Sequence, residues 1–174
     1  MIPVEAPRPR ALVVATVAVL AAGGLALFLS APRRATHAPA GYRAMEVTAV
    51  TPTGSAGYAV QLADAGRSRS ITVYVGASEG LAISLRVEGR RYPRPLSMDL
   101  LDSVLRELGG ELERVQIDEL RDNTFHGSLI VRQGSRTIDV DARPSDALAL
   151  ALGRRAPILV AEPVIAAAGH DVDR

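Results

Sequence analysis

The sequence predicts one α+β domain with a mostly antiparallel sheet and about three packed helices, preceded by one transmembrane helix. Segments with strand and helix patterns follow one another in the order βββααβββαβ. Runs of antiparallel strands interrupted by helices favour the α+β class over a doubly wound parallel sheet. A chain of 174 residues is long enough for one such domain with flanking segments. The segment 11–31 has no charged residue, and about 20 apolar residues span a bilayer as a helix.

The first half of the domain is expected to form three strands and then two helices. Alternating apolar residues predict the strands Met45–Val50, Tyr58–Asp64 and Ser70–Gly76. The segment Ala77–Gly89 is expected to be a helix that ends at a left-handed glycine. Ser97–Gly110 has the pattern of an amphipathic helix, with Ser97 as its N-cap.

The second half is expected to form three more strands, one helix and a last strand. The strands are predicted at Leu112–Leu120, Thr124–Val131 and Arg136–Ala142. A helix should begin at Pro144, because proline is favoured at the first helical position, where its missing N–H costs nothing. The apolar stretch Ala156–Glu162 is predicted to close the core as a strand.

The N-terminal segment indicates attachment to a membrane. The chain is divided into a flank at 1–10, a transmembrane helix or signal-anchor at 11–31, a linker at 32–43, a domain at 44–168 and a disordered tail at 169–174. A cleaved signal peptide is the alternative, although its apolar region is usually only about 7–15 residues. Arginines on the N-terminal flank favour a single-pass topology with the domain outside the cytoplasm.

The composition excludes several kinds of chemistry. The chain has no cysteine and no lysine, so disulfides, thiolate metal sites and a P-loop lysine are excluded. Its three histidines, His37, His126 and His170, are spread over the linker, a strand and the tail, which argues against a zinc site. Catalysis would therefore use carboxylates, arginines and serines, with Mg²⁺ or Mn²⁺ as the expected cation and no organic cofactor.

The stretch DVDARPSDALALALGRR, residues 139–155, carries most of the candidate polar groups. Asp139 and Asp141 share one strand face, where two carboxylates could bind a divalent cation. Arg143 stands beside the free N–H groups at the start of a helix, which suit a phosphate. Each of these residues also has a structural interpretation, as a solvated strand face or as a capped helix whose dipole favours Asp146.

Three stretches together resemble the bifunctional nuclease domain family. They are VYVGASEGLAISLRVEG, RPLSMDLLDSVLRELGGELERVQIDELRDNTFHGSLIV and DVDARPSDALALALGRRAPILVAEPV, within Tyr42 to Val164. The resemblance implies a compact α+β domain with DNase and RNase activity that self-associates, with a dimer favoured. Two positions depart from the family pattern: Met98 stands where the family often has histidine, and Gly80 where it tends to have alanine.

The resemblance and the residue types together give the candidate site. The catalytic candidates are Glu79, Asp99, Asp141 and Asp146. The candidates for substrate binding are Arg90, Arg91, Arg94, Arg143 and Ser145. The candidate metal ligands are Asp139 and Asp141.

Two functions of different class stay open from the sequence. The first is a membrane-tethered nuclease that hydrolyses phosphodiester bonds of DNA and RNA with a carboxylate-bound divalent cation. The second is a non-catalytic, self-associating binding or regulatory module anchored to the membrane. From residue 41 onward the chain has 16 arginines and 18 acids, a net charge of −2, so nucleic acid would have to be held by a local basic patch.

Overall fold

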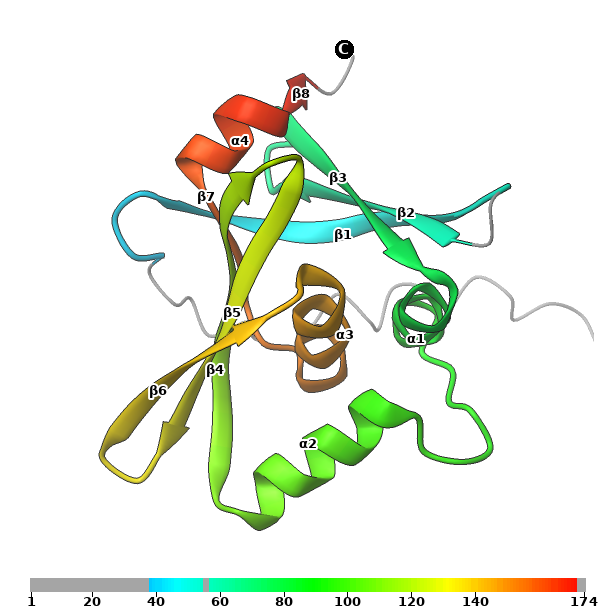
Figure 1. Ribbon diagram of the computed structural model, residues 1–174, viewed down its shortest axis with the longest axis vertical. Coiled ribbons are helices and arrows are strands. Elements are labelled where there is room, and N and C mark those ends of the chain that lie inside the picture. Colours follow the sequence, from blue (N-terminus) through cyan, green and yellow to red (C-terminus); the bar gives the residue numbers. More distant parts are fainter. Residues whose placement is uncertain (1–37, 55–56, 172–174) are drawn as a thin grey trace, which may run out of the picture. The chain divides into compact units, whose positions relative to one another are not determined.

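The computed structural model describes residues 38–54 and 57–171, which form one sheet with four helices (Figure 1). The first half comprises β1 (Tyr42–Thr53), β2 (Gly57–Asp64), β3 (Arg69–Gly76), α1 (Ala77–Val87) and α2 (Ser97–Glu107). The second half comprises β4 (Gly110–Arg121), β5 (Thr124–Gln133), β6 (Arg136–Ala142), α3 (Pro144–Arg154), β7 (Ile158–Ala161), α4 (Glu162–Ala168) and β8 (His170–Asp171).

The sheet has eight strands in the order β6-β5-β4-β7-β1-β2-β3-β8. Strand β7 pairs in parallel with β4 and antiparallel with β1, and the other neighbouring strands are antiparallel. A parallel return needs a long crossover, usually through a helix. Helix α3 provides that crossover between β6 and β7, so β7 joins the strands β1–β3 to the strands β4–β6.

Helix α3 lies at the centre of the fold, between the sheet and the helices α1 and α2 (Figure 1). The five consecutive residues 147–151 of this helix are each at most 1% exposed. The alanines let neighbouring backbones approach closely, while Leu148 and Leu150 fill the space between α3 and the strands. Burying a leucine side chain stabilises the fold by about 1.5–3 kcal/mol, so α3 is a main part of the core.

Helix α1 packs closely on β2 through a glycine. A Cβ atom added to the buried Gly80 would lie 2.1 Å from Cδ2 and 2.4 Å from Cγ of Tyr58. The absence of a side chain at this position therefore makes room for the Tyr58 ring. Gly89 follows the helix with a φ of +66°, the left-handed conformation expected from the sequence.

The turn between β2 and β3 is organised by the carboxylate of Asp64. Its Oδ1 accepts hydrogen bonds from the backbone N–H groups of Ser68 (2.7 Å) and Arg69 (3.2 Å). Its Oδ2 accepts from the Ser68 hydroxyl (2.6 Å) and from Arg43 (3.2 Å). These donors, with the Ser68 hydroxyl first, lower the pKa of Asp64 to about 2.

The predicted fold class was wrong in three respects, although the elements from β1 to β7 follow one another as expected. The sheet is mixed, because the α3 crossover sets β7 parallel to β4. Helix α4 was missed: Glu162, expected to end a strand, begins a helix with Pro163 in its first turn. Strand β8 was also missed, since His170 and Asp171 pair with the edge of β3.

The predicted transmembrane helix at 11–31 lies outside the described residues, as do the flank 1–10 and the first half of the linker, residues 32–37. No helix in the part of the chain that the structure describes combines the length and apolar character needed to cross a membrane. The boundaries assigned from the sequence stay predictions.

We expect Gly80→Ala to destabilise the domain. Overpacking against Tyr58 costs about 1–3 kcal/mol, which exceeds the gain of up to about 1 kcal/mol from replacing a helical glycine by alanine. Gly66→Ala is the matched control, because a Cβ there meets nothing within 4 Å. Urea unfolding followed by circular dichroism measures both, and equal or greater stability of Gly80→Ala would contradict the packing described.

We expect Asp64→Asn to lower stability in a pH-dependent way. The folded-state pKa is below the unfolded value of 3.8, so the stabilisation by Asp64 is complete above that pH and is lost as pH falls toward 2. The loss should be at most about 2 kcal/mol at pH 7 and should approach zero at pH 2. Thermal unfolding across this pH range tests the prediction, with Glu107→Gln as the control, because the Glu107 side chain is 80% exposed. A loss of stability that does not depend on pH would contradict it.

Candidate functional site

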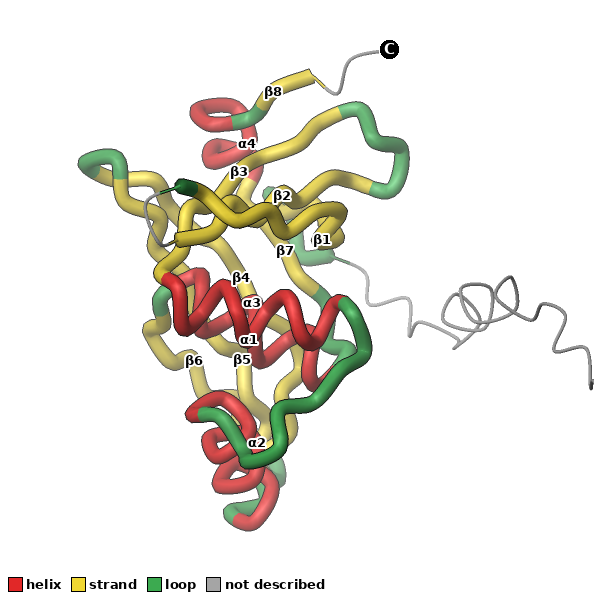
Figure 2. The backbone as a smooth tube through the Cα atoms, turned by 90° about the vertical axis from the view of Figure 1, so that its right-hand side faces the viewer, coloured by secondary structure: helices red, strands yellow, loops and turns green. Residues whose placement is uncertain are grey.

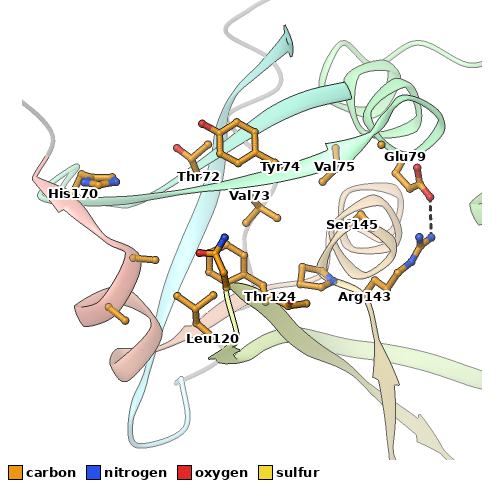
Figure 3. A pocket seen from close by; sticks show the side chains of 16 residues that line it. Thr72, Val73, Tyr74, Val75, Glu79, Leu120, Thr124, Arg143, Ser145 and His170 are labelled. Atoms are coloured by element: carbon orange, nitrogen blue, oxygen red, sulfur yellow. Dashed lines mark hydrogen bonds and ion pairs between the residues drawn. The ribbon is translucent and has the colours of Figure 1, made fainter. Parts of the chain in front are cut away.

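A cleft of about 700 Å³ lies where four segments of the chain meet (Figure 3). One wall is formed by Thr72–Gly76 of β3 and by Glu79 at the start of α1. The opposite wall is formed by the turn between β4 and β5 and by residues 143–145 at the start of α3. The end of α4 and His170 complete the lining.

Arg143 is the central charged group of the cleft. Its Nε and Nη2 atoms donate to the two carboxylate oxygens of Asp146, at 2.8 and 3.1 Å. Nη2 also donates to Oε1 of Glu79 at 2.8 Å, the contact drawn in Figure 3. The Arg143 side chain is 66% exposed, whereas those of Glu79 and Asp146 are 23% exposed.

The cleft places positive and negative groups side by side around Arg143. Hydrogen bonds to Asp146 and then to Glu79 raise the pKa of Arg143, so the guanidinium stays charged. Helices α1 and α3 both begin at the cleft, with Gly76 and Arg143 as their N-caps. Each helix start carries a partial positive charge. At α3 the N–H of Ser145 is the remaining donor of the first turn, because Pro144 has no N–H and the N–H of Asp146 donates to the Arg143 carbonyl.

The remaining lining is mixed apolar and polar. Tyr74 is 75% exposed on β3. Phe125 and Leu120 line the other wall, and Ser145 stands beside Arg143. Tyr74, Phe125 and His170 were not predicted as site residues. Alternation along β3 points Tyr74 away from the buried Val73 and Val75, but only the fold shows which segments it faces.

Asp99 lies away from the cleft and has two structural partners. Its Oδ2 accepts a hydrogen bond from the backbone N–H of Leu96 at 2.8 Å, which caps the start of α2. Its Oδ1 accepts from Nη2 of Arg86 at 2.6 Å. Met98, where the family often has histidine, packs against the hydrophobic core and does not line the cleft.

Asp139 and Asp141 are exposed on β6 and do not line the cleft. They pair with Ile130 and Ser128 of β5, whose side chains point away from the core face of that strand. The four catalytic candidates therefore do not converge: Glu79 and Asp146 meet at Arg143, whereas Asp99 and Asp141 lie elsewhere.

The face of the sheet that carries Asp139 and Asp141 holds further polar groups. Asp118 accepts hydrogen bonds from Tyr42 (2.8 Å) and Ser128 (2.9 Å). Burial, followed by the hydrogen bond to Asp118, raises the pKa of Tyr42. Within residues 38–54 and 57–171, no group of three or more His, Asp or Glu side chains could hold a metal ion.

The remaining substrate-binding candidates, Arg90, Arg91 and Arg94, lie in the exposed loop between α1 and α2. They do not line the cleft. The structure thus separates the predicted substrate-binding residues into a cleft group, Arg143 and Ser145, and a loop group.

Comparison with known proteins agrees with the resemblance seen in the sequence. The family model described as the bifunctional nuclease domain matches residues 60–173. The chain belongs to the bifunctional nuclease domain family. The matched residues include both walls of the cleft, so the site described above lies within the bifunctional nuclease domain.

Two relatives come from Mycobacterium tuberculosis: the uncharacterized protein MT1877 of strain CDC 1551 and the uncharacterized protein Rv1829 of strain H37Rv. Each is 42% identical to this chain over 108 residues, which is 62% of this chain. The match spans 64% of the length of each relative.

We expect Asp99→Ala to affect stability and not the chemistry of the cleft. Loss of the cap on α2 and of the Arg86 ion pair should cost about 1–2 kcal/mol. Glu107→Ala is the matched control, because its side chain is 80% exposed on the same helix. Chemical unfolding measures the loss. A folded Asp99→Ala protein that lacks any activity found for the wild type would place Asp99 in the reaction.

Proposed function

We propose that the cleft binds DNA and RNA and hydrolyses their phosphodiester bonds. Membership of the bifunctional nuclease domain family supports a nuclease-like function. One observation supports the cleft as the place of this reaction: the exposed Arg143 guanidinium lies beside Glu79, where two helices begin. This arrangement combines an anion site with a carboxylate.

The pairing of Arg143 adds little to stability and is better explained by a role in the cleft. An ion pair on an exposed arginine contributes about 0–1 kcal/mol, and Arg143 is 66% exposed. Asp146, three residues along the same helix, instead fixes the direction of the guanidinium. A guanidinium held in one orientation binds a phosphate with less loss of side-chain entropy.

In the proposed reaction, a substrate phosphate binds to Arg143 and to the start of α3. The hydroxyl and the backbone N–H of Ser145 can donate further hydrogen bonds to phosphate oxygens, whereas Pro144 has no N–H and the N–H of Asp146 donates to the Arg143 carbonyl. Arg143 stabilises the negative charge that grows on those oxygens as water attacks phosphorus. Its permanent positive charge suits this role.

Glu79 is the proposed general base. It takes a proton from the attacking water, a new P–O bond forms to that water, and the bond from phosphorus to the leaving nucleotide oxygen breaks. That leaving oxygen takes up a proton from solvent. Asp146 acts in this scheme as a positioning residue, because both of its carboxylate oxygens accept from Arg143.

The expected Mg²⁺ or Mn²⁺ has two candidate ligands, Asp139 and Asp141, on β6. Mg²⁺ is commonly bound by one or two carboxylates together with water and substrate phosphate, so this pair is compatible with a cation that a bound strand helps to hold. When bound, such an ion would supply positive charge to a phosphate of the strand beside β6, outside the cleft that holds the phosphate at Arg143. Activity measured with Mg²⁺, Mn²⁺ or EDTA tests the requirement.

The alternative function is a non-catalytic binding module. It is favoured by one observation: Arg143, Glu79 and Asp146 already satisfy one another in the cleft. Such a module would bind nucleic acid without cleaving it. Self-association and an extracytoplasmic location stay predictions from the sequence.

We expect Arg143→Ala and Glu79→Gln each to lower the rate of phosphodiester hydrolysis by about 100-fold or more, because each removes one group that acts in the transition state. Arg143→Lys should be hardly more active than Arg143→Ala, since an ammonium group cannot replace the planar guanidinium. Arg136→Ala, which removes a charge from exposed β6, is the control. Cleavage of fluorescent single-stranded DNA and RNA gives the rates.

Retention of full activity by folded Arg143→Ala and Glu79→Gln would place the reaction outside the cleft. Tight nucleic-acid binding by a wild-type protein that never cleaves, with or without divalent cations, would favour the binding module.

A further inference from the structure

The loop between α1 and α2 carries a compact group of positive charges. Its sequence RRYPRP, residues 90–95, holds three arginines and one tyrosine, and all six residues are exposed. We call this segment the arginine loop. Figure 2 shows it leaving the end of α1 and descending to α2.

Two of the three arginines have no ion-pair partner among the residues that the structure describes. Arg90 donates to Glu88 at 2.9 Å, and this ion pair offsets the charge of Arg90. The same bond, followed by one from Ser84, lowers the pKa of Glu88. Arg91 and Arg94, in contrast, form no ion pair or hydrogen bond with any described residue. Most other described arginines are paired with a carboxylate, among them Arg43, Arg69, Arg86, Arg132, Arg143 and Arg154.

The arginine loop also holds an exposed aromatic ring in a restricted backbone. Tyr92 is 53% exposed. Pro93 and Pro95 fix their φ angles, and each restricts the residue before it, so ordering this loop around a ligand costs less entropy than for most loops. Two unpaired guanidinium groups flanking an exposed ring match the chemistry of a single-stranded nucleic acid, which offers phosphates and unpaired bases.

The position of the arginine loop relates it to the cleft. Helix α1 begins at the cleft, and the loop follows its other end. Eleven residues of α1 span about 16 Å at 1.5 Å per residue. Between Glu79 and Glu88 this helix has no acidic side chain, and its outward positions include the neutral Leu81 and Ser84. Between its two ends α1 itself therefore presents no acidic side chain to a phosphate backbone, and the nearby Asp99 and Glu88 are each paired with an arginine.

We propose that the arginine loop is a second contact site for a single-stranded nucleic acid whose reacting phosphate lies in the cleft. Arg91 and Arg94 bind backbone phosphates, and Tyr92 stacks on a base. The inference rests on the proposed function, which places the reaction in the cleft. It adds that the binding affinity depends on the length of the nucleic-acid strand. Strands that reach the arginine loop bind more tightly than strands that fill only the cleft.

The test compares Arg91→Ala/Arg94→Ala with Arg106→Ala/Arg136→Ala in the full 174-residue chain. The second pair removes the same charge from exposed positions outside the loop. Fluorescence anisotropy with a single strand of about 12 nucleotides should show a Kd raised about tenfold for the loop variant only. The slope of log K against log salt should fall by about 1.4, since each phosphate contact on a single strand contributes about 0.7. Tyr92→Ala should weaken binding with little change in slope.

Cleavage of a dinucleotide separates this inference from the proposed function. The loop variant should cleave it at the wild-type rate, whereas Arg143→Ala should not. If the wild type binds the longer strand through the arginine loop but cleaves nothing, the proposed function fails and the inference stands. An unchanged Kd and salt slope in the loop variant, or no binding of the strand by the wild type, overturns the inference.

Discussion

The burial of α3 is the constraint on which the rest of the structure depends. Residues Ala147–Ala151 are enclosed on all sides by sheet and helices, which requires small side chains wherever a neighbouring backbone approaches. The same helix returns the chain from β6 to β7, and its first residues form a wall of the cleft. Because the helix cannot shift without opening the core, Arg143 at its start is held in a fixed position relative to β3 and α1.

The cleft and the arginine loop differ in whether their arginines are paired with carboxylates. In the cleft, one arginine is shared by two carboxylates on two helices, which orients it and leaves the local net charge negative. In the loop, two arginines have no acidic neighbour among the described residues, so their attraction for anions is not offset. A domain whose acids slightly outnumber its arginines can therefore still present positive potential in one place.

The sequence predicted most elements of the fold because their signals are local. Alternation in β3 and the Pro144 start of α3 depend on neighbouring residues alone. The parallel placement of β7 depends on contacts between residues about 40 positions apart, such as Val115 and Ile158, and no local pattern encodes them. Helix α4 was missed because its seven residues, Glu162–Ala168, are too few for a helical repeat to stand out, although Pro163 in its first turn is a local signal.

For the candidate site, sequence reasoning found the residue types but not their grouping. It identified Arg143, Glu79 and Asp146, which meet, and also Asp99 and Asp141, which do not join them. Asp99 has the same signal as Glu79, an acid in the first turn of a helix, and only the fold shows that one faces a cleft and the other caps its own helix. Tyr74 could have been found from its outward position on β3, but the β4–β5 turn that also lines the cleft is about 50 residues away in the sequence.

The position of β7 has a consequence for the order of assembly. Strands β1–β3 and β4–β6 are each consecutive antiparallel neighbours, so each group can form by local pairing as it leaves the ribosome. The strand that joins them, β7, comes later in the chain than all six. Until residues 158–161 emerge, β1 and β4 each present an edge that is central in the finished sheet, and such edges readily pair with other chains. A nascent chain that stops before β7 would therefore hold two half-sheets and would be prone to aggregate, although most of its secondary structure could already be present.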